Sequence, residues 1–182
     1  TNGVDLDFFD VREDRSSLRR RLGLPLTGPI ALYSGHLFPF KGVDLVLECA
    51  RQLPGIHFLI VGGADQDVEI YRQRSAHMSN IRVLGFIPPG NIAEYLTAAD
   101  IFLLPNLSST LISYRSPLKI FEYCAARRPI VASSLPQFQE FLKDGQTAFV
   151  FNPDDLQSFK NAIQRSLENP PKSAQIVDQA YE

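Results

Sequence analysis

The sequence predicts a doubly wound α/β fold, with a six-stranded parallel sheet and helices on both faces. Short apolar runs typical of buried strands alternate along the chain with segments whose apolar residues recur at helical spacing. Strands that alternate with helices of this length form right-handed βαβ units, whose parallel sheets are covered on both faces. The chain has 182 residues, 45% hydrophobic and 21% charged, which fits one ordinary domain with a substantial core.

The expected strands are residues 30–34, 56–62, 81–85, 100–105, 129–133 and 147–151. Helical patterns lie between them at residues 43–52, 91–98 and 154–168, the second after a turn at residues 88–90. Residues 1–14 carry a turn signal and several acids, and are interpreted as a lead-in to a domain over residues 15–182. Sheets of this kind bind ligands at the carboxyl ends of their strands, which directs attention to the loops after Ser34, Gly62, Gly85 and Pro105.

Composition excludes several classes of partner. The net charge of −2 provides no broad basic face for nucleic acid. No apolar run reaches the roughly 18 residues that span a bilayer, and no signal peptide is visible. Cys49 and Cys124 each fall in a helical apolar pattern and are expected to be buried, reduced thiols. The first residue is Thr1, so we expect a piece of a longer protein.

The most informative segment begins at Ser116-Pro117. Ser116 suits a helix N-cap and Pro117 the first helical turn, which leaves the amides of Leu118 and Lys119 at the positive end of a helix. Such an end attracts phosphate, and Glu122 lies one turn inside. The segment therefore indicates a nucleotide site; the alternative is a capped helix that binds nothing.

The loop after the first strand contains Gly35, His36 and Lys41. Gly35 and the following Gly42 let the backbone approach a ligand, and Lys41 offers a compact cation suited to a diphosphate. An exposed lysine on a turn is the alternative. His36 could donate to a phosphate or sugar hydroxyl, or simply cap the loop.

Two further loops offer backbone rather than charge. Gly62-Gly63 permits close approach of a sugar or phosphate, although neither a dinucleotide fingerprint nor a P-loop is present. The acids that follow, Asp65 and Asp67, are interpreted as a helix start rather than a metal site. Gly85-Phe86-Ile87 offers bare amides and an apolar surface for a nucleobase, or else a hydrophobic plug beneath the next helix.

Taken in order, these motifs resemble the carboxyl-terminal, donor-binding domain of GT-B retaining glycosyltransferases, the group called family 4 or group 1. The resemblance covers nearly the whole chain and depends on several weak motifs in one order. The matching segments are residues 2–5, 35–37, 41–44, 60–63, 83–86, 99–105, 116–132, 144–145 and 153–155.

The resemblance implies a Rossmann-like domain that binds a UDP- or GDP-linked sugar and moves a hexose, with retention, to an acceptor hydroxyl in glycan, lipopolysaccharide or glycolipid synthesis. It implies that Glu122 holds the ribose and that Lys41 neutralises the diphosphate. It also implies that the backbone of residues 117–119 cradles the phosphates through the amides of Leu118 and Lys119, since Pro117 has no N–H to donate. The loop over residues 85–87 would receive the base. Cations and a helix dipole can stabilise the leaving group, so no cofactor or metal is expected.

The chain departs from the family pattern at three positions. Many members have a glutamate where this chain has Tyr114, so contacts to the donor sugar must come from Ser113, Arg115 or backbone groups. His36 stands where many members have arginine. Arg127 replaces the usual small residue, and in a left-handed turn it would cost about 1 kcal/mol.

Enzymes of this family have two such domains, and the acceptor site comes from the amino-terminal one. This chain is therefore expected to fold alone, to bind nucleotides weakly and to transfer nothing, with its catalytic residues unassigned. The parent is expected in the cytoplasm, peripheral to a membrane where its acceptor is lipid-linked. The alternatives are a GT-B nucleotide-sugar epimerase and a non-catalytic regulatory module, although no strand here ends in an acidic residue as a receiver requires.

Overall fold

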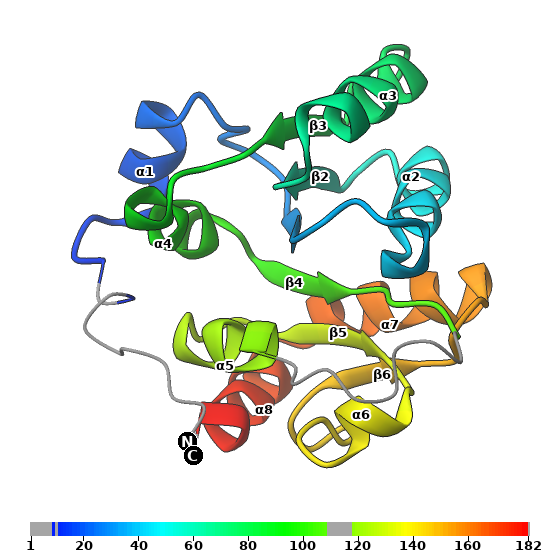
Figure 1. The fold of residues 1–182 in the computed structure, drawn as a ribbon. Coiled ribbons are helices and arrows are strands. Elements are labelled where there is room, and N and C mark those ends of the chain that lie inside the picture. Colours follow the sequence, from blue (N-terminus) through cyan, green and yellow to red (C-terminus); the bar gives the residue numbers. More distant parts are fainter. Residues whose placement is uncertain (1–8, 10, 109–117, 182) are drawn as a thin grey trace.

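A six-stranded, all-parallel sheet forms the centre of the protein (Figure 1). The computed structural model describes Phe9 and residues 11–108 and 118–181. The strand order is β3-β2-β1-β4-β5-β6, so the chain builds outward from β1 in one direction and then from β4 in the other. The doubly wound fold predicted from the sequence is confirmed, and the crevice where β1 and β4 diverge is the position at which such sheets bind ligands.

The strands match the apolar runs closely. They are β1 (Ile30–Ser34), β2 (His57–Val61), β3 (Ile81–Gly85), β4 (Ile101–Leu104), β5 (Ile130–Ser133) and β6 (Phe149–Phe151). Each lies within its predicted range, and four are one or two residues shorter at an end, which is the usual uncertainty of strand boundaries.

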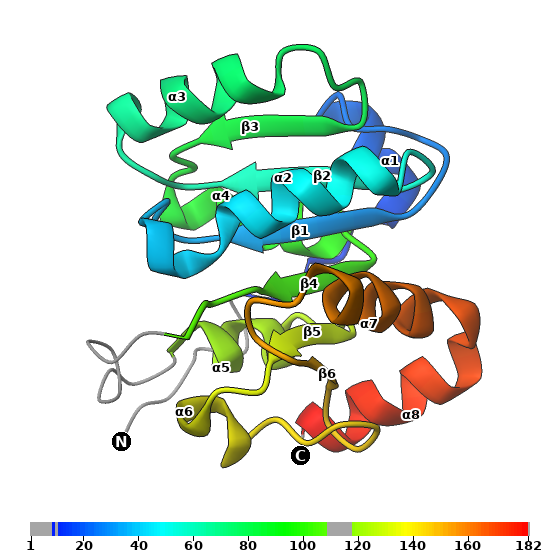
Figure 2. The same cartoon turned by 90° about the vertical axis from the view of Figure 1, so that its right-hand side faces the viewer.

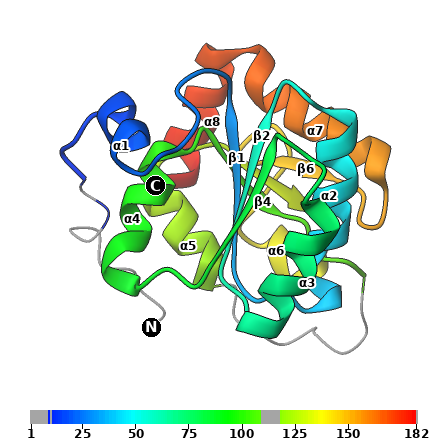
Figure 3. The same cartoon turned by 90° about the horizontal axis from the view of Figure 1, so that it is seen from above.

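Alternate residues of the strands belong to two separate cores. Ala31 and Tyr33 of β1 pack with α2 (Val43–Gln52), α3 (Asp65–Ser75) and α7 (Leu156–Glu168). Ile30 and Leu32 pack with α1 (Arg15–Arg21), α4 (Pro89–Ala98) and α5 (Leu118–Ala125) on the other face. Figures 2 and 3 show these two layers of helices on opposite sides of the sheet. A continuous apolar run is therefore required, because both faces of each central strand are buried.

Several helices differ from the prediction. The predicted turn at residues 88–90 is wrong, since Pro89 and Gly90 already belong to α4; proline is tolerated in a first turn because its missing N–H would be unpaired there. The sequence did not indicate α1, the short α6 (Pro136–Gln139) or α8 (Pro170–Tyr181). Helix α7 begins at residue 156 because Asp155 caps it, accepting from the amide of Ser158 at 2.9 Å.

The short helix α1 follows the predicted lead-in. The side chain of Asp14 accepts hydrogen bonds from the amides of Ser16 and Ser17 at 3.0 and 3.1 Å, which caps the helix. Arg127, after α5, has φ of 50°, so this residue does adopt the left-handed conformation whose cost was considered from the sequence.

Both cysteines are free thiols, as expected. Cys49 is fully buried in α2 and Cys124 is half-buried in α5. Burial raises the pKa of Cys49 to about 12 and that of Cys124 to about 11, so the reactive thiolate is scarce at neutral pH. We expect slow reaction of the folded protein with a disulfide reagent at pH 8, and rapid reaction of two thiols after unfolding. Rapid labelling of Cys49 in the folded state would contradict this prediction.

Candidate functional site

A cleft of about 520 Å³ lies at the carboxyl ends of β1 and β2, beside α5 and the start of α4. It brings together eight of the thirteen predicted donor-site residues, namely Gly35, His36, Gly62, Gly63, Phe86, Ile87, Lys119 and Glu122. Its remaining lining comes from Ser34, Val61, Ala64, Pro89 and Ile92. Three loops separated in the sequence and one helix therefore share one cleft.

The glycine loops are joined through their backbones. The amide of Gly35 donates to the carbonyl of Val61 at 2.9 Å, and the amide of Gly62 donates to that of Gly85 at 2.7 Å. Gly62 has φ of 99°, and a Cβ at this position would lie 2.4 Å from the carbonyl oxygen of Gly35. Only glycine allows this approach, so the ends of the first two strands stay close and leave their backbone facing the cleft.

The loop after β1 is held by aromatic side chains. The hydroxyl of Tyr33, largely buried beneath the loop, donates to the carbonyl of His36 at 2.5 Å. The His36 ring stacks on Phe38 with centroids 5.1 Å apart and 10° between planes. The imidazole is thus oriented at the edge of the cleft by its neighbours.

The segment after β3 carries one exposed and one packed apolar side chain. Ile87 packs into the core beneath α4, whereas the side chain of Phe86 is 69% exposed. Arg72 of α3 fixes the end of the strand by donating to the carbonyls of Val83 and Leu84 at 3.0 and 3.3 Å. Phe86 therefore offers an aromatic face at the cleft on a firmly held backbone.

Helix α5 brings the charged groups. Lys119 and Glu122, one turn apart, form an ion pair of 2.6 Å, and each side chain is about one-third exposed at 32% and 28%. Ser116 and Pro117, the predicted cap and first turn, lie outside the described residues, as does Tyr114. Glu122 and Lys119 both line the cleft, and the carboxylate and the ammonium are paired with each other.

Of the predicted donor residues that the structure describes, three are not part of the cleft lining. Gly85 lies beneath it, bonded to Gly62. Leu118 is exposed at the start of α5. Lys41 ends a 3₁₀ turn over Pro39–Lys41, with its ammonium 5.7 Å from the centre of the Phe40 ring.

Among the described residues, no group of three or more His, Cys, Asp or Glu side chains is arranged to hold a metal ion. Asp65 and Asp67 lie in the first turn of α3, as expected of acids that start a helix. Over the same part of the chain, no helix combines the length and apolarity needed to cross a bilayer.

Comparison with known families gives the first independent evidence of function. The family described as Glycosyl transferases group 1 matches residues 14–182. The chain belongs to this family. The resemblance drawn from the sequence motifs is therefore confirmed, and nearly the whole domain takes part in the match.

Relatives and solved structures agree with this assignment. A D-inositol 3-phosphate glycosyltransferase from Mycolicibacterium paratuberculosis is 28% identical over 186 residues, which cover 98% of this chain and 41% of that protein. HepE from Anabaena, solved with UDP and glucose, is 22% identical with a TM-score of 0.84 over 98% of this chain and 49% of its own. The C-terminal domain of the group 1 protein LpcC from Francisella tularensis is 17% identical with a TM-score of 0.78, over 98% and 95% of the two chains. The chain thus spans less than half of the full-length relative and nearly all of an isolated C-terminal domain.

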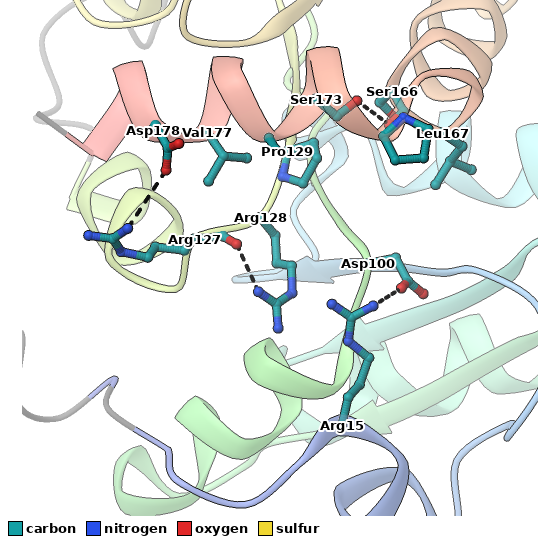
Figure 4. Close-up of a pocket in the computed structure, with 12 residues that line it drawn as sticks. Arg15, Asp100, Arg127, Arg128, Pro129, Ser166, Leu167, Ser173, Val177 and Asp178 are labelled. Carbon is teal, nitrogen blue, oxygen red and sulfur yellow. Dashed lines mark hydrogen bonds and ion pairs between the residues drawn. The ribbon is translucent and has the colours of Figure 1, made fainter.

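The glycosyltransferase domain has a second cleft, of about 460 Å³, at the opposite end of the sheet near Asp100 and Pro129 (Figure 4). Its guanidinium groups are engaged within the protein. Arg15 pairs with Asp100 at 2.5 Å, and Arg127 lies 3.7 Å from Asp178. Arg128 donates to the carbonyls of residues 97, 99 and 127 at 2.8–3.0 Å. Arg128 binds carbonyls at the C-terminal end of α4, Arg15 joins α1 to Asp100, and Arg127 approaches Asp178 of α8. All three therefore connect elements of the fold.

Several residues that line the first cleft were not indicated by the sequence. Pro89 and Ile92 line it because α4 begins earlier than predicted. Ser34 also lines it, and its partner Tyr123 is fully buried behind Glu122. Tyr123 is a buried residue of α5, and nothing in the sequence indicated the partner of its hydroxyl.

Proposed function

We propose that this domain binds the nucleoside diphosphate sugar donor of a retaining glycosyltransferase, which transfers a hexose to an acceptor hydroxyl. One observation carries the proposal: Glu122 and Lys119 face the glycine loops and Phe86 across a single cleft at the diverging strands. Ligands of doubly wound sheets bind at this position. A UDP-linked hexose is the first choice of donor, because HepE is known with UDP, glucose and UDP-glucose.

Each part of the cleft matches one part of such a donor. The carboxylate of Glu122 accepts hydrogen bonds from the ribose hydroxyls, which as charge-assisted bonds are worth roughly 1.5–3 kcal/mol. Lys119 and, from outside the cleft lining, Lys41 neutralise the diphosphate, together with the amides of Leu118 and Lys119 and the backbone at Gly35 and Gly62–Gly63. Phe86 and the backbone beside it receive the base. These cations stabilise the departing diphosphate, so the proposal requires no metal.

The cleft accounts for the donor, and the acceptor site is assigned to another part of the parent protein. The relatives' greater length supports an amino-terminal domain that supplies the acceptor site. On this basis the isolated chain binds donor weakly and transfers nothing, while the parent protein carries out glycan, lipopolysaccharide or glycolipid synthesis.

Calorimetry with UDP, GDP and UDP-glucose tests the proposal directly. We expect saturable binding of UDP and UDP-glucose that is insensitive to EDTA, and tighter than binding of uridine. Failure of every nucleoside diphosphate to bind would overturn it. Transfer to an added acceptor by the parent protein separates a glycosyltransferase from an epimerase, and turnover by the isolated chain would contradict the proposed division between domains.

The two lysines can be separated by substitution. We expect Lys119→Ala and Lys41→Ala each to weaken UDP binding by roughly tenfold while leaving the weaker binding of uridine almost unchanged, because each removes a cation from the diphosphate alone. Lys143, exposed in the segment between α6 and β6 and absent from the cleft lining, provides the control for loss of a positive charge. Equal losses for UDP and uridine in either variant would remove that lysine from the phosphate site.

A further inference from the structure

Tyr123 links the helix that carries Glu122 to the end of the first strand. Its ring is fully buried and stacks on Phe102 of β4, with centroids 4.4 Å apart and 24° between planes. Its hydroxyl accepts a hydrogen bond from the backbone amide of Ser34 at 2.9 Å and lies 3.2 Å from the Ser34 Oγ. The hydroxyl is therefore engaged twice within the core.

The Tyr123 hydroxyl lies where the pairing between β1 and β4 ends. The pairing of β1 with β4 ends at Tyr33 and Leu103, one residue before Ser34. At the next position the amide of Gly35 turns to the other side and bonds to Val61 of β2. Neighbouring amides of a strand point to opposite sides, so the amide of Ser34 faces β4 just where β4 has departed. Tyr123 supplies the acceptor that the sheet no longer provides.

Packing alone does not account for this hydroxyl. A phenylalanine would fill the same space against Phe102, and an apolar ring is easier to bury than a phenol. Both ends of the bond adjoin residues of the cleft: Ser34 lines the cleft together with Gly35, and Glu122, which also lines it, directly precedes Tyr123. The bond thus connects the loop after β1 to the helix that carries Glu122.

We propose that Tyr123 is a positioning residue for the donor: its hydroxyl sets the place of Glu122 on α5 relative to the backbone of Ser34 and Gly35. The inference rests on the proposed function, because it assigns a consequence for nucleotide binding. Without the bond, the amide of Ser34 is buried without this partner, and α5 and the β1 loop can move apart. The carboxylate and the loop backbone would then no longer be held at the separation that one nucleotide bridges.

A double-mutant cycle on UDP affinity tests this inference. Tyr123→Phe keeps the ring and removes the hydroxyl, and we expect it to weaken UDP binding about three- to tenfold. If Tyr123 acts through Glu122, the double variant Glu122→Ala/Tyr123→Phe should bind UDP no worse than about twofold below Glu122→Ala alone. Tyr71→Phe provides the matched control, since Tyr71 is a buried tyrosine of α3 in the opposite core and is absent from the cleft.

Melting temperature and UDP affinity together distinguish a positioning role of Tyr123 from a purely structural one. Both tyrosine variants are expected to lower the melting temperature, but only Tyr123→Phe to change the UDP dissociation constant measured well below that temperature. If the unaltered chain binds UDP and Tyr123→Phe binds it equally well, or if the losses in the double variant simply add, the positioning role is wrong while the proposed function stands. If the unaltered chain binds no nucleoside diphosphate, both fall.

Discussion

Glu122→Ala is expected to weaken UDP binding by roughly 10- to 100-fold, because it removes a charged acceptor from two ribose hydroxyls. The same change should hardly affect folding. The carboxylate is bonded to Lys119 in the structure, but both side chains are about one-third exposed at 28% and 32%. Pairs of this kind contribute about 0–1 kcal/mol, which corresponds to at most about 4 °C in melting temperature for a chain of this size.

The expected separation of binding from stability decides between two roles of this glutamate. A ligand contact predicts a large loss of affinity at nearly constant melting temperature, whereas a structural ion pair predicts the reverse. Alanine favours helix, so α5 itself should persist. Glu168→Ala, at the exposed end of α7, serves as the control for loss of a carboxylate. A large fall in melting temperature with unchanged UDP binding would remove Glu122 from the ribose site.

The Glu122→Ala substitution also changes the surroundings of Lys119. Without its carboxylate partner, the ammonium of Lys119 is released from a contact of 2.6 Å and becomes more available to phosphate. Glu122→Ala should therefore lose affinity for uridine and UDP alike, while pyrophosphate binding is retained or improved. Measuring all three ligands locates the ribose contact within the nucleotide.

Much of the fold could be predicted because both faces of the sheet are buried. Ile30 to Ser34 reads as an unbroken apolar run in the sequence, and alternate side chains enter opposite cores. Helices were harder where local signals conflict. A Pro-Pro-Gly sequence favours a turn, yet Pro89 begins α4, since apolar side chains further along the helix pack on the sheet. The amphipathic α8 was missed because its few buried positions, such as Ile176, form a sparse pattern.

The candidate site could be predicted where the backbone itself forms it. Glycine loops and an acidic residue one turn inside a helix are visible in sequence, and Gly35, Gly62 and Glu122 do share one cleft. Contacts between distant side chains are not visible in this way. The bond between Tyr123 and Ser34 depends on the departure of β4 after residue 104, which no local pattern encodes.

Gly42→Ala is expected to destabilise the domain by about 2–5 kcal/mol, through backbone strain and a collision with neighbouring backbone. Gly42 precedes α2 with φ of 73°, and a Cβ there would lie 1.8 Å from the carbonyl oxygen of Pro105. The amide of Leu107 donates to the carbonyl of Phe40 at 2.9 Å, which holds the same two segments together. The obstacle is therefore backbone on both sides, and neither segment can yield by changing a rotamer.

Substitutions at two other glycines distinguish the cost of a positive φ from the cost of the backbone collision. Gly23 also has a positive φ, of 62°, but a Cβ there meets nothing within 4 Å, so Gly23→Ala should cost only about 1 kcal/mol. Gly90 lies in α4 with open space around it, and Gly90→Ala should be neutral or stabilise by up to about 1 kcal/mol. Denaturant unfolding of the three variants should rank them in this order. If Gly42→Ala cost no more than Gly23→Ala, the close packing of the β1 loop against the segment after β4 would be wrong.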